Sequence, residues 1–392
     1  MEIVSGVILK YSIPLLLAGL IAESCRSGSG MKESDLNPDR IIAPLSVAKE
    51  VSDLSEYVEE VVTCRIGDAD LFTMPPMKFL QDEKTFFFVH GGTVYALSKD
   101  GVSFRTIGKR GRGPGEYLGI IDICLDVTGQ EILCLSIYGD GIFRYEKNSG
   151  RFLGKVEITE PPGSPEGIMP VEGGGFFVYY PGSESGTDYA SEEPFYCLWQ
   201  YDRSGSVVSK SLRRTDFNLS AAFFSPVTQL DRDSYLLVPQ ASLSRSPLIE
   251  RGRMKSVWMF DLGKEGLPPQ YALREKEDPW RLVGDIFDSD YYKLVHGVYL
   301  TKNVLHVSFF GAGGMGWNAE ISRDGETGIM WKSVLGNAVA SDEEYLYFAL
   351  PAYTNLPAES ADDVLVLYLK GLGILSESSD EWSLIKLKIR VE

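Results

Sequence analysis

The chain has 392 residues and a formal net charge of −17, with 38 Lys and Arg against 55 Asp and Glu. A surface this acidic repels phosphate backbones and anionic headgroups, so we expect no nucleic-acid partner. Hydrophobic residues make up 44% and charged residues 24%, as in an ordinary globular protein. The abundance of Gly, Pro, Tyr and Phe favours strands and tight turns over helices.

The N-terminus has the pattern of an export signal. Ile13–Ala22 is an apolar run that is too short to span a bilayer and suits the apolar region of a secretory signal. It leads into Ala22–Cys25, which resembles a bacterial lipobox, although a plain signal peptide with an incidental Cys remains an alternative. We therefore predict a lipoprotein signal peptide over residues 1–25, with acylation of Cys25, and a flexible tether over residues 26–50.

Four further cysteines follow, Cys64, Cys124, Cys134 and Cys197. An exported chain can form disulfides, and Cys124 and Cys134 flank one turn across which they could pair. The alternative is that all four are small, buried, apolar side chains.

From residue 51 onward the chain repeats an apolar strand, a polar turn that closes on Gly, and a second strand. Gly suits such turns because it accepts a positive φ. Recurrence about every 55 residues indicates one propeller blade per repeat. We therefore predict an all-β domain over residues 51–392, a six-bladed β-propeller with four-stranded antiparallel blades. The turn glycines are Gly101, Gly150, Gly205, Gly266, Gly325 and Gly371.

Two further features concern how the ring is completed and decorated. Tyr57–Ile66 precedes the first blade without a hairpin partner, so we expect this N-terminal strand to close the ring by pairing with Ser383–Val391 of the last blade. Pro181–Pro194 and Ala241–Lys255 are predicted as long inserts, and long loops on a rigid ring often carry function.

Three segments carry a family resemblance: Val51–Glu59, Val94–Gly101 and above all Gly108–Tyr117, with its Gly-Arg-Gly-Pro-Gly-Glu core. With six blades and a lipid anchor, the chain resembles the β-propeller lipoproteins of Bacteroides-type bacteria, distant relatives of NHL-repeat propellers. The resemblance implies a propeller in the cell envelope, anchored to the outer membrane, and implies no established activity. No acidic run follows Cys25, which favours the periplasmic side over the cell surface.

The Gly-rich segment Gly108–Tyr117 is predicted as an ordered loop between two blades. A phosphate-binding loop needs a helix directly after it, whereas a strand follows here. We expect Arg112 and Glu116 to form an ion pair that fixes the loop. In the alternative, Lys109, Arg110 and Arg112 bind an anionic group.

Histidines are scarce, with only His90, His296 and His306 in the chain. That number is small for a zinc site, and no Gly-x-Ser-x-Gly nucleophile motif is present. We therefore assign no catalytic residue, metal or cofactor. Together with Arg112 and Glu116, the ligand-binding candidates are His296, Trp317 and Asn318. Trp317 is expected either to stack on a sugar or peptide or to plug the channel mouth.

Taken together, the sequence predicts a monomeric, lipid-anchored binding or scaffold protein for a protein, peptide or glycan, without catalysis. The less favoured alternative is a calcium-assisted hydrolase or lyase resembling propeller lactonases. That activity would require Asp122, Asp285 or Asn318 to point into the axial channel. Asp285, Asp288 and Asp290 do not have the spacing of a calcium-binding loop, and we expect them in a solvated acidic loop.

Overall fold

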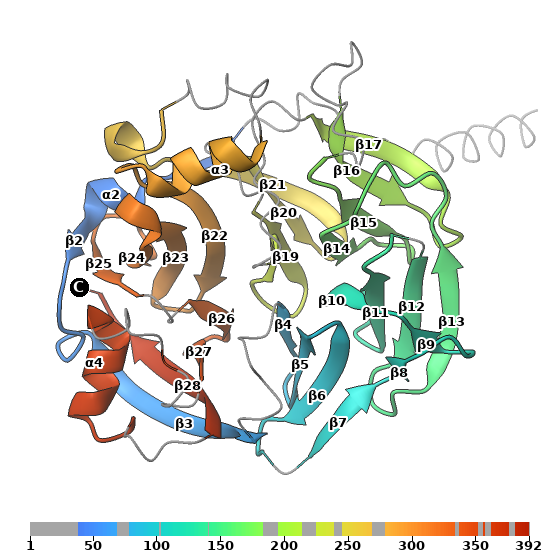
Figure 1. Ribbon diagram of the computed structural model, residues 1–392, viewed down its shortest axis with the longest axis horizontal. Coiled ribbons are helices and arrows are strands. Elements are labelled where there is room, and N and C mark those ends of the chain that lie inside the picture. Colours follow the sequence, from blue (N-terminus) through green and yellow to red (C-terminus); the bar gives the residue numbers. More distant parts are fainter. Residues whose placement is uncertain are drawn as a thin grey trace, which may run out of the picture.

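The computed structural model contains six sheets arranged as blades around one axis (Figure 1). Each blade has four antiparallel strands, and the first strand of each blade lies next to the axis. The prediction of an all-β, six-bladed propeller is confirmed. The described residues are 38–68, 78–101, 103–139, 141–182, 195–213, 225–238, 245–268, 279–333, 337–351, 356, 362–375 and 381–391.

The blades are numbered I to VI along the chain, and their strands are given from the axis outward. Blade I contains β4 (Lys78–Gln81), β5 (Thr85–His90), β6 (Thr93–Ser98) and β7 (Phe104–Ile107). Blade II contains β10 (Ile120–Leu125), β11 (Glu131–Ser136), β12 (Gly141–Glu146) and β13 (Phe152–Glu157). Blade III contains β14 (Gly167–Pro170), β15 (Phe176–Tyr179), β16 (Tyr196–Tyr201) and β17 (Val207–Arg213).

The second half of the ring follows the same order. Blade IV contains β18 (Val227–Gln229), β19 (Ser234–Leu237), β20 (Arg245–Glu250) and β21 (Arg253–Phe260). Blade V contains β22 (Lys293–Leu300), β23 (Val304–Phe310), β24 (Gly316–Ser322) and β25 (Gly328–Lys332). Blade VI contains β26 (Ala338–Ser341), β27 (Leu346–Leu350), β28 (Glu381–Ile389) and β3 (Val58–Asp68).

Apolar runs form these strands because neighbouring blades cover both of their faces. In β5, Phe86, Phe87, Phe88 and Val89 are all buried. Polar turns with a left-handed residue connect the third and fourth strands of a blade. Four of the expected turn glycines have positive φ there: Gly101 (+76°), Gly150 (+71°), Gly205 (+86°) and Gly325 (+82°).

Two expected hairpins are absent from the described residues. Val364–Gly371 is helix α4, because Asp363 caps it by accepting a hydrogen bond from the Val366 amide at 3.0 Å. Its apolar run is equally suited to a buried strand, so the run alone could not distinguish the two. Gly266 instead follows a short 3-10 helix, η4 (Gly263–Glu265), after β21.

The expected insert Ala241–Lys255 is also wrong, because most of it is sheet. Strand β20 fills its middle and pairs with β21 across a turn at Arg251 and Gly252, where φ is +50° and +76°. Strand β20 contains Pro247, a residue type that is rare inside paired strands. The other expected insert is Pro181–Pro194, and its residues 183–194 lie outside the described residues.

The ring closes as the sequence predicts. Strand β3, from the beginning of the domain, pairs antiparallel with β28, from its end, over a register that runs from Asp68 opposite Glu381 to Val58 opposite Ile389. This pairing completes blade VI with strands from both ends of the domain.

The chain before β3 follows the outer rim of the ring (blue in Figure 1). Strand β1 (Arg40–Ile42) pairs parallel with β21, and β2 (Ala48–Glu50) pairs parallel with β25, with α2 (Pro44–Val47) between them. The paired chain thus begins inside the segment expected to be a tether. The outer edges of blades IV and V offer unpaired backbone groups that these strands satisfy.

Helices occupy connections between strands. Helix α3 (Pro279–Asp288) precedes β22 and contains Asp285, so the expected acidic loop begins as a helix. No helix within the described ranges is long and apolar enough to cross a membrane. Cys124 and Cys134 are buried free thiols, so they do not form a disulfide.

Candidate functional site

The turns between first and second strands, and between third and fourth strands, lie together on one face of the ring, which we call the hairpin face. A cavity of about 950 Å³ opens there. Turns of blades I, II, IV, V and VI line it, so residues far apart in sequence meet at this point. Such a volume is ample for a small ligand or the end of a longer one.

Basic side chains are concentrated around this hairpin-face cavity. Its lining contains six Lys or Arg and five Asp or Glu, whereas in the whole chain the acids outnumber the bases by 55 to 38. The cavity therefore carries the opposite balance of charge from the rest of the protein. The basic residues are Lys84, Lys99, Lys147, Arg232, Lys302 and Arg323.

Most of the acidic side chains in the lining have structural partners. Asp82 accepts hydrogen bonds from the Lys84 and Thr85 amides, both at 2.8 Å. Asp342 does the same for Glu344 (2.9 Å) and Tyr345 (2.8 Å). These aspartates stabilise the first turn of their blades.

Asp231 plays the same part in blade IV, where it accepts from the Asp233 amide at 2.8 Å. An Asp at the start of the turn between the first and second strands is thus a sequence feature of these blades. The search for turn glycines did not detect it. Thr301 takes its place in blade V, where its hydroxyl accepts from the Val304 amide at 3.1 Å.

Two of the basic side chains form ion pairs with nearby carboxylates. Lys147 lies 2.6 Å from Asp82, and Lys302 forms an ion pair with Glu344. Burial opposes ionisation of Asp82, but hydrogen bonds from Lys147 and two amides outweigh it and lower the pKa of this carboxyl.

Lys99 and Arg323 differ from these pairs. Lys99 is partly buried and Arg323 is exposed in the lining, and neither has a carboxylate within ion-pair distance among the described residues. The Lys99 ammonium lies 5.1 Å from the ring centre of Phe86 and 6.0 Å from that of Tyr347. Burial lowers the pKa of Lys99, and Asp342 partly offsets this. One Arg323 nitrogen donates to the Thr301 carbonyl at 2.7 Å.

Two glutamines of the lining leave polar atoms without a partner. The Gln81 amide donates to Gln229 Oε1 at 2.9 Å, and the Gln81 side chain donates to the Ser341 carbonyl. Gln81 Oε1 and Gln229 Nε2 are buried and make no hydrogen bond within the described structure. One acceptor and one donor beside the cavity are therefore left without a described partner.

Near the axis, a second charged pair is fully satisfied. Lys78 Nζ on β4 lies 3.2 Å from Asp122 Oδ1 on β10, with side-chain exposures of 2% and 0%. Lys78 also donates to the Val227 carbonyl, and Asp122 Oδ2 accepts from the Ile168 amide at 2.8 Å. The cation beside Asp122 is thus the ammonium group of Lys78. The contacts of this pair join the inner strands of blades I to IV.

Blade V contains a hydrogen-bonded Ser-His-Glu chain. His306 Nε2 lies 2.8 Å from Ser308 Oγ, and His306 Nδ1 lies 2.8 Å from Glu320 Oε1. The spacing resembles a hydrolytic triad, but all three residues are fully buried, and Ser308 donates to Asn318 Oδ1 at 2.7 Å. Because no substrate can reach the hydroxyl, the chain is a structural network.

The sequence reasoning missed this network. The sequence pattern that could have revealed it is His-x-Ser on β23 and Asn-x-Glu on β24. Alternate residues of a strand share a face, so each pair of side chains lies on the same side of the sheet. In the register, His306 lies opposite Glu320 and Ser308 lies opposite Asn318.

The Gly-rich loop is ordered and self-contained. Its ends form a short parallel pair, β8 (Lys109–Arg110) with β9 (Glu116–Tyr117). Glu116 pairs with Lys109 at 2.8 Å and accepts from the Gly113 amide at 2.8 Å, which lowers the pKa of Glu116. The expected Arg112–Glu116 pair is therefore replaced by Lys109–Glu116, and Arg112 is exposed.

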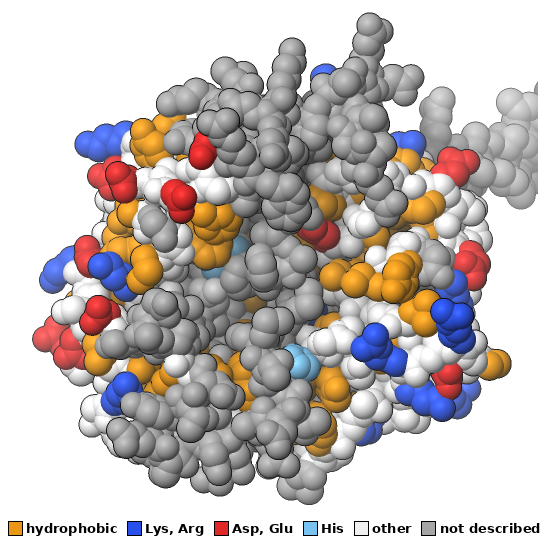
Figure 2. All heavy atoms as spheres, viewed as in Figure 1, with side chains coloured by type: hydrophobic (Ala, Val, Ile, Leu, Met, Phe, Trp, Pro, Cys, Tyr) orange, Lys and Arg blue, Asp and Glu red, His pale blue; other side chains and the backbone are white. Residues whose placement is uncertain are grey.

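The loop also joins blades I and II. The Tyr117 hydroxyl donates to the Ile107 carbonyl at 2.9 Å, and the Tyr145 hydroxyl donates to the Gly115 carbonyl at 3.0 Å. Figure 2 shows Lys and Arg side chains gathered on the right of the ring, over β8, β9 and β13.

The other expected site residues do not converge with this loop. Trp317 on β24 is 6% exposed and packs against Tyr292, with ring centres 5.9 Å apart. Asn318 is fully buried in the blade V network. His296 on β22 is 5% exposed, with its ring 4.6 Å from that of Phe310. Cys25 lies outside the described residues.

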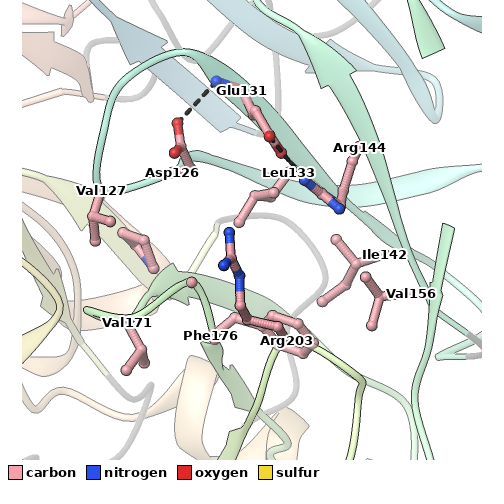
Figure 3. A pocket seen from close by; sticks show the side chains of 13 residues that line it. Asp126, Val127, Glu131, Leu133, Ile142, Arg144, Val156, Val171, Phe176 and Arg203 are labelled. Carbon is pink, nitrogen blue, oxygen red and sulfur yellow. Dashed lines mark hydrogen bonds and ion pairs between the residues drawn. The ribbon is translucent and has the colours of Figure 1, made fainter. Parts of the chain in front are cut away.

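A second cavity lies between blades II and III and is much smaller, about 50 Å³. Figure 3 shows Arg203 pointing into it, with the Glu131–Arg144 ion pair behind. Its volume suits one or a few water molecules rather than a ligand. No group of three or more His, Cys, Asp or Glu in the described parts of the chain is placed to hold a metal ion.

Comparison with known proteins agrees with this architecture. A family described as 6-bladed beta-propeller matches residues 81–316. The chain belongs to this family. No curated protein matches it.

A solved structure with a TM-score above 0.5 shows the same fold. An exported protein from Bacteroides fragilis is 14% identical, with a TM-score of 0.65 over 90% of this chain and 99% of that one. Virginiamycin B lyase from Staphylococcus aureus is 10% identical, with a TM-score of 0.43 over 84% of this chain and 99% of that one. At such identities the likeness concerns the fold alone.

Proposed function

We propose that this propeller is a non-catalytic binding protein of the cell envelope, and that its ligand site is the hairpin-face cavity. The observation that carries the proposal is the cavity itself, about 950 Å³ in volume and lined by the turns of five blades. A closed ring holds these turns rigidly, so a ligand would meet a preformed surface. Proteins, peptides and glycans remain the partner classes, bound by a monomer.

The described chemistry gives less support to a calcium-assisted hydrolase or lyase. Asp122 is engaged by Lys78, Asn318 by Ser308, and Asp285 lies on α3. These three groups therefore do not form a common set of oxygen ligands.

Hydrogen–deuterium exchange during titration with peptide and glycan libraries tests the site. We expect a binding ligand to protect the turns at 81–85, 229–232 and 341–343, while 108–119 stays unchanged, and to be recovered intact by mass spectrometry. Protection confined to other surfaces would overturn the placement of the site. Chemical turnover of the ligand would overturn the non-catalytic assignment.

We also propose that residues 1–25 are a lipoprotein signal, that Cys25 is acylated, and that the protein faces the periplasm from the outer membrane. The support is the apolar run before Cys25. Twelve residues between Cys25 and the first described residue, Pro38, would span up to roughly 40 Å when extended. Mass spectrometry of the mature N-terminus, with Cys25→Ser as the control, checks the acylation. An unmodified N-terminus would contradict it.

A further inference from the structure

The hairpin-face cavity holds two cations whose charge the described protein does not balance. A buried cation normally has a carboxylate partner, because burial without one is costly. Lys99 is partly buried and Arg323 is exposed in the lining, and neither has an ion pair with a described residue, whereas Lys147 and Lys302 in the same lining are paired. Lys84, which is exposed, also has no ion pair with a described residue, so Lys99 is distinguished by being both partly buried and without such a pair.

The acidic residues of the lining are poorly placed to neutralise Lys99 and Arg323. Asp82 and Asp342 accept hydrogen bonds from turn amides, and Asp342 also accepts from the Tyr347 hydroxyl. Glu83 at the rim is exposed, with Arg232 4.0 Å away. Negative charge for the two free cations must come from solution or from a ligand.

Two polar atoms without partners also indicate a polar ligand. Gln81 Oε1 and Gln229 Nε2 are buried in the lining without a hydrogen bond to any described residue. Once the two side chains turn toward the cavity, a ligand that presents one donor and one acceptor, such as a hydroxyl or amide group, would satisfy both.

We propose that the ligand of this cavity is an anion, a carboxylate or phosphate group attached to a hydroxylated or amide-containing body, with Lys99 and Arg323 as its charged contacts. This inference rests on the proposed function and specifies the ligand class of that same site. Charge-assisted hydrogen bonds from Lys and Arg are the strongest contacts available to such a group. The acidic remainder of the surface disfavours nonspecific anion binding, so selectivity comes from the cavity.

Isothermal titration calorimetry with three anions and their neutral counterparts tests the proposal. D-glucuronate and glucose 6-phosphate are each compared with glucose, and N-acetyl-L-glutamate is compared with N-acetyl-L-glutamine. We expect an anion to bind at least about ten-fold more tightly than its counterpart, since a charged hydrogen bond contributes that much. The carboxylate and phosphate arms show which group the site prefers.

Matched variants locate the effect. Lys99→Met and Arg323→Gln should each weaken anion binding about ten-fold or more, and Lys99→Arg should restore most of it. Lys210→Met is the control, because Lys210 also lies over an aromatic ring, 3.8 Å from the centre of Trp199, but on the outer strand β17. Thermal melting of each variant checks that it is folded.

Three outcomes would overturn the proposal: no anion binds at 10 mM, the neutral counterparts bind equally well, or Lys99→Met and Lys210→Met bind alike. Equal binding of neutral compounds, with exchange protection at the cavity turns, would leave the proposed function intact and reject only the anion. Binding of every compound away from the cavity would reject both.

Discussion

Two sets of cations in the ring invite comparison, Lys78 near the axis and Lys99 with Arg323 at the hairpin face. Lys78 is buried and forms an ion pair with Asp122 at 3.2 Å. Lys99 is only partly buried and Arg323 is exposed, and neither has a carboxylate partner within the described structure. The fully paired lysine serves the fold, whereas the unpaired cations are available to a ligand.

The two sets of cations should contribute to different properties, Lys78 to folding stability and Lys99 with Arg323 to ligand binding. Removing one partner of a buried ion pair leaves an uncompensated charge inside the protein. Removing a cation that has no partner relieves a cost instead of creating one. Substitutions at the two places should therefore affect different measurements.

The largest effect is expected at the axis. Lys78→Met should lower the free energy of unfolding by about 3–5 kcal/mol, because Asp122 stays buried without its cation. The double variant Lys78→Met/Asp122→Asn should recover part of the loss, since the asparagine keeps an acceptor for the Ile168 amide. Urea denaturation measures both, and a loss below about 1 kcal/mol in the single variant would contradict the structural role of the pair.

A buried neutral group in blade V, His296, should make stability depend on pH. Burial lowers the pKa of His296 to about 3, from an ordinary value near 6.5. The unfolded chain therefore binds a proton that the folded chain does not, and stability falls as pH drops from about 6.5 toward 3.

Replacing His296 by Phe should remove this part of the pH dependence, which amounts to a few kcal/mol at most. Urea denaturation at pH 7 and pH 4.5 measures it for both proteins. The same pH dependence in His296→Phe as in the parent protein would show that His296 is not the group responsible.

A smaller loss of stability is expected from substitutions in the loop between blades I and II. Gly108 has φ +64°, and an added Cβ would lie 2.6 Å from the Tyr145 hydroxyl, so Gly108→Ala should cost about 2 kcal/mol. Gly101→Ala is the control, with φ +76° but open space around the Cβ, and should cost about 1 kcal/mol. Equal losses in thermal melting would show that the contact with Tyr145 does not matter.

The smallest effect on stability is expected at the cavity. Lys99→Met should change the free energy of unfolding by less than about 0.5 kcal/mol, while anion binding is lost. In the parent protein, anion affinity should fall as pH rises through the pKa of Lys99, which burial places below its ordinary value of 10.5. Calorimetry across alkaline pH measures this fall, and constant affinity up to pH 10.5 would exclude Lys99 as a contact.

The sequence predicted most of the ring because its signals are local. Glycines with positive φ, such as Gly150 and Gly325, identify hairpins, and the unpaired strand before blade I implies closure with β28. Helix α4 was not predicted because its continuous apolar run shows no helical periodicity of apolar and polar residues. Asp363 before it is a residue type that often caps a helix N-terminus.

The candidate site could not be predicted in the same way. Lys99 and Arg323 lie in turns of blades I and V, and only closure of the ring brings these turns around one cavity. Trp317 and Asn318 were expected to contact a ligand, but the pairing of β24 on both sides buries them. Exposure is a property of the assembled ring and not of a short segment.

The account is tested most directly by locating a bound anion in a crystal of this protein soaked with selenate, whose selenium gives an anomalous signal. We predict an anomalous peak in the hairpin-face cavity, within hydrogen-bond distance of Lys99 or Arg323. A peak confined to the exposed loop around Arg112, with the cavity empty and free of lattice contacts, would contradict it.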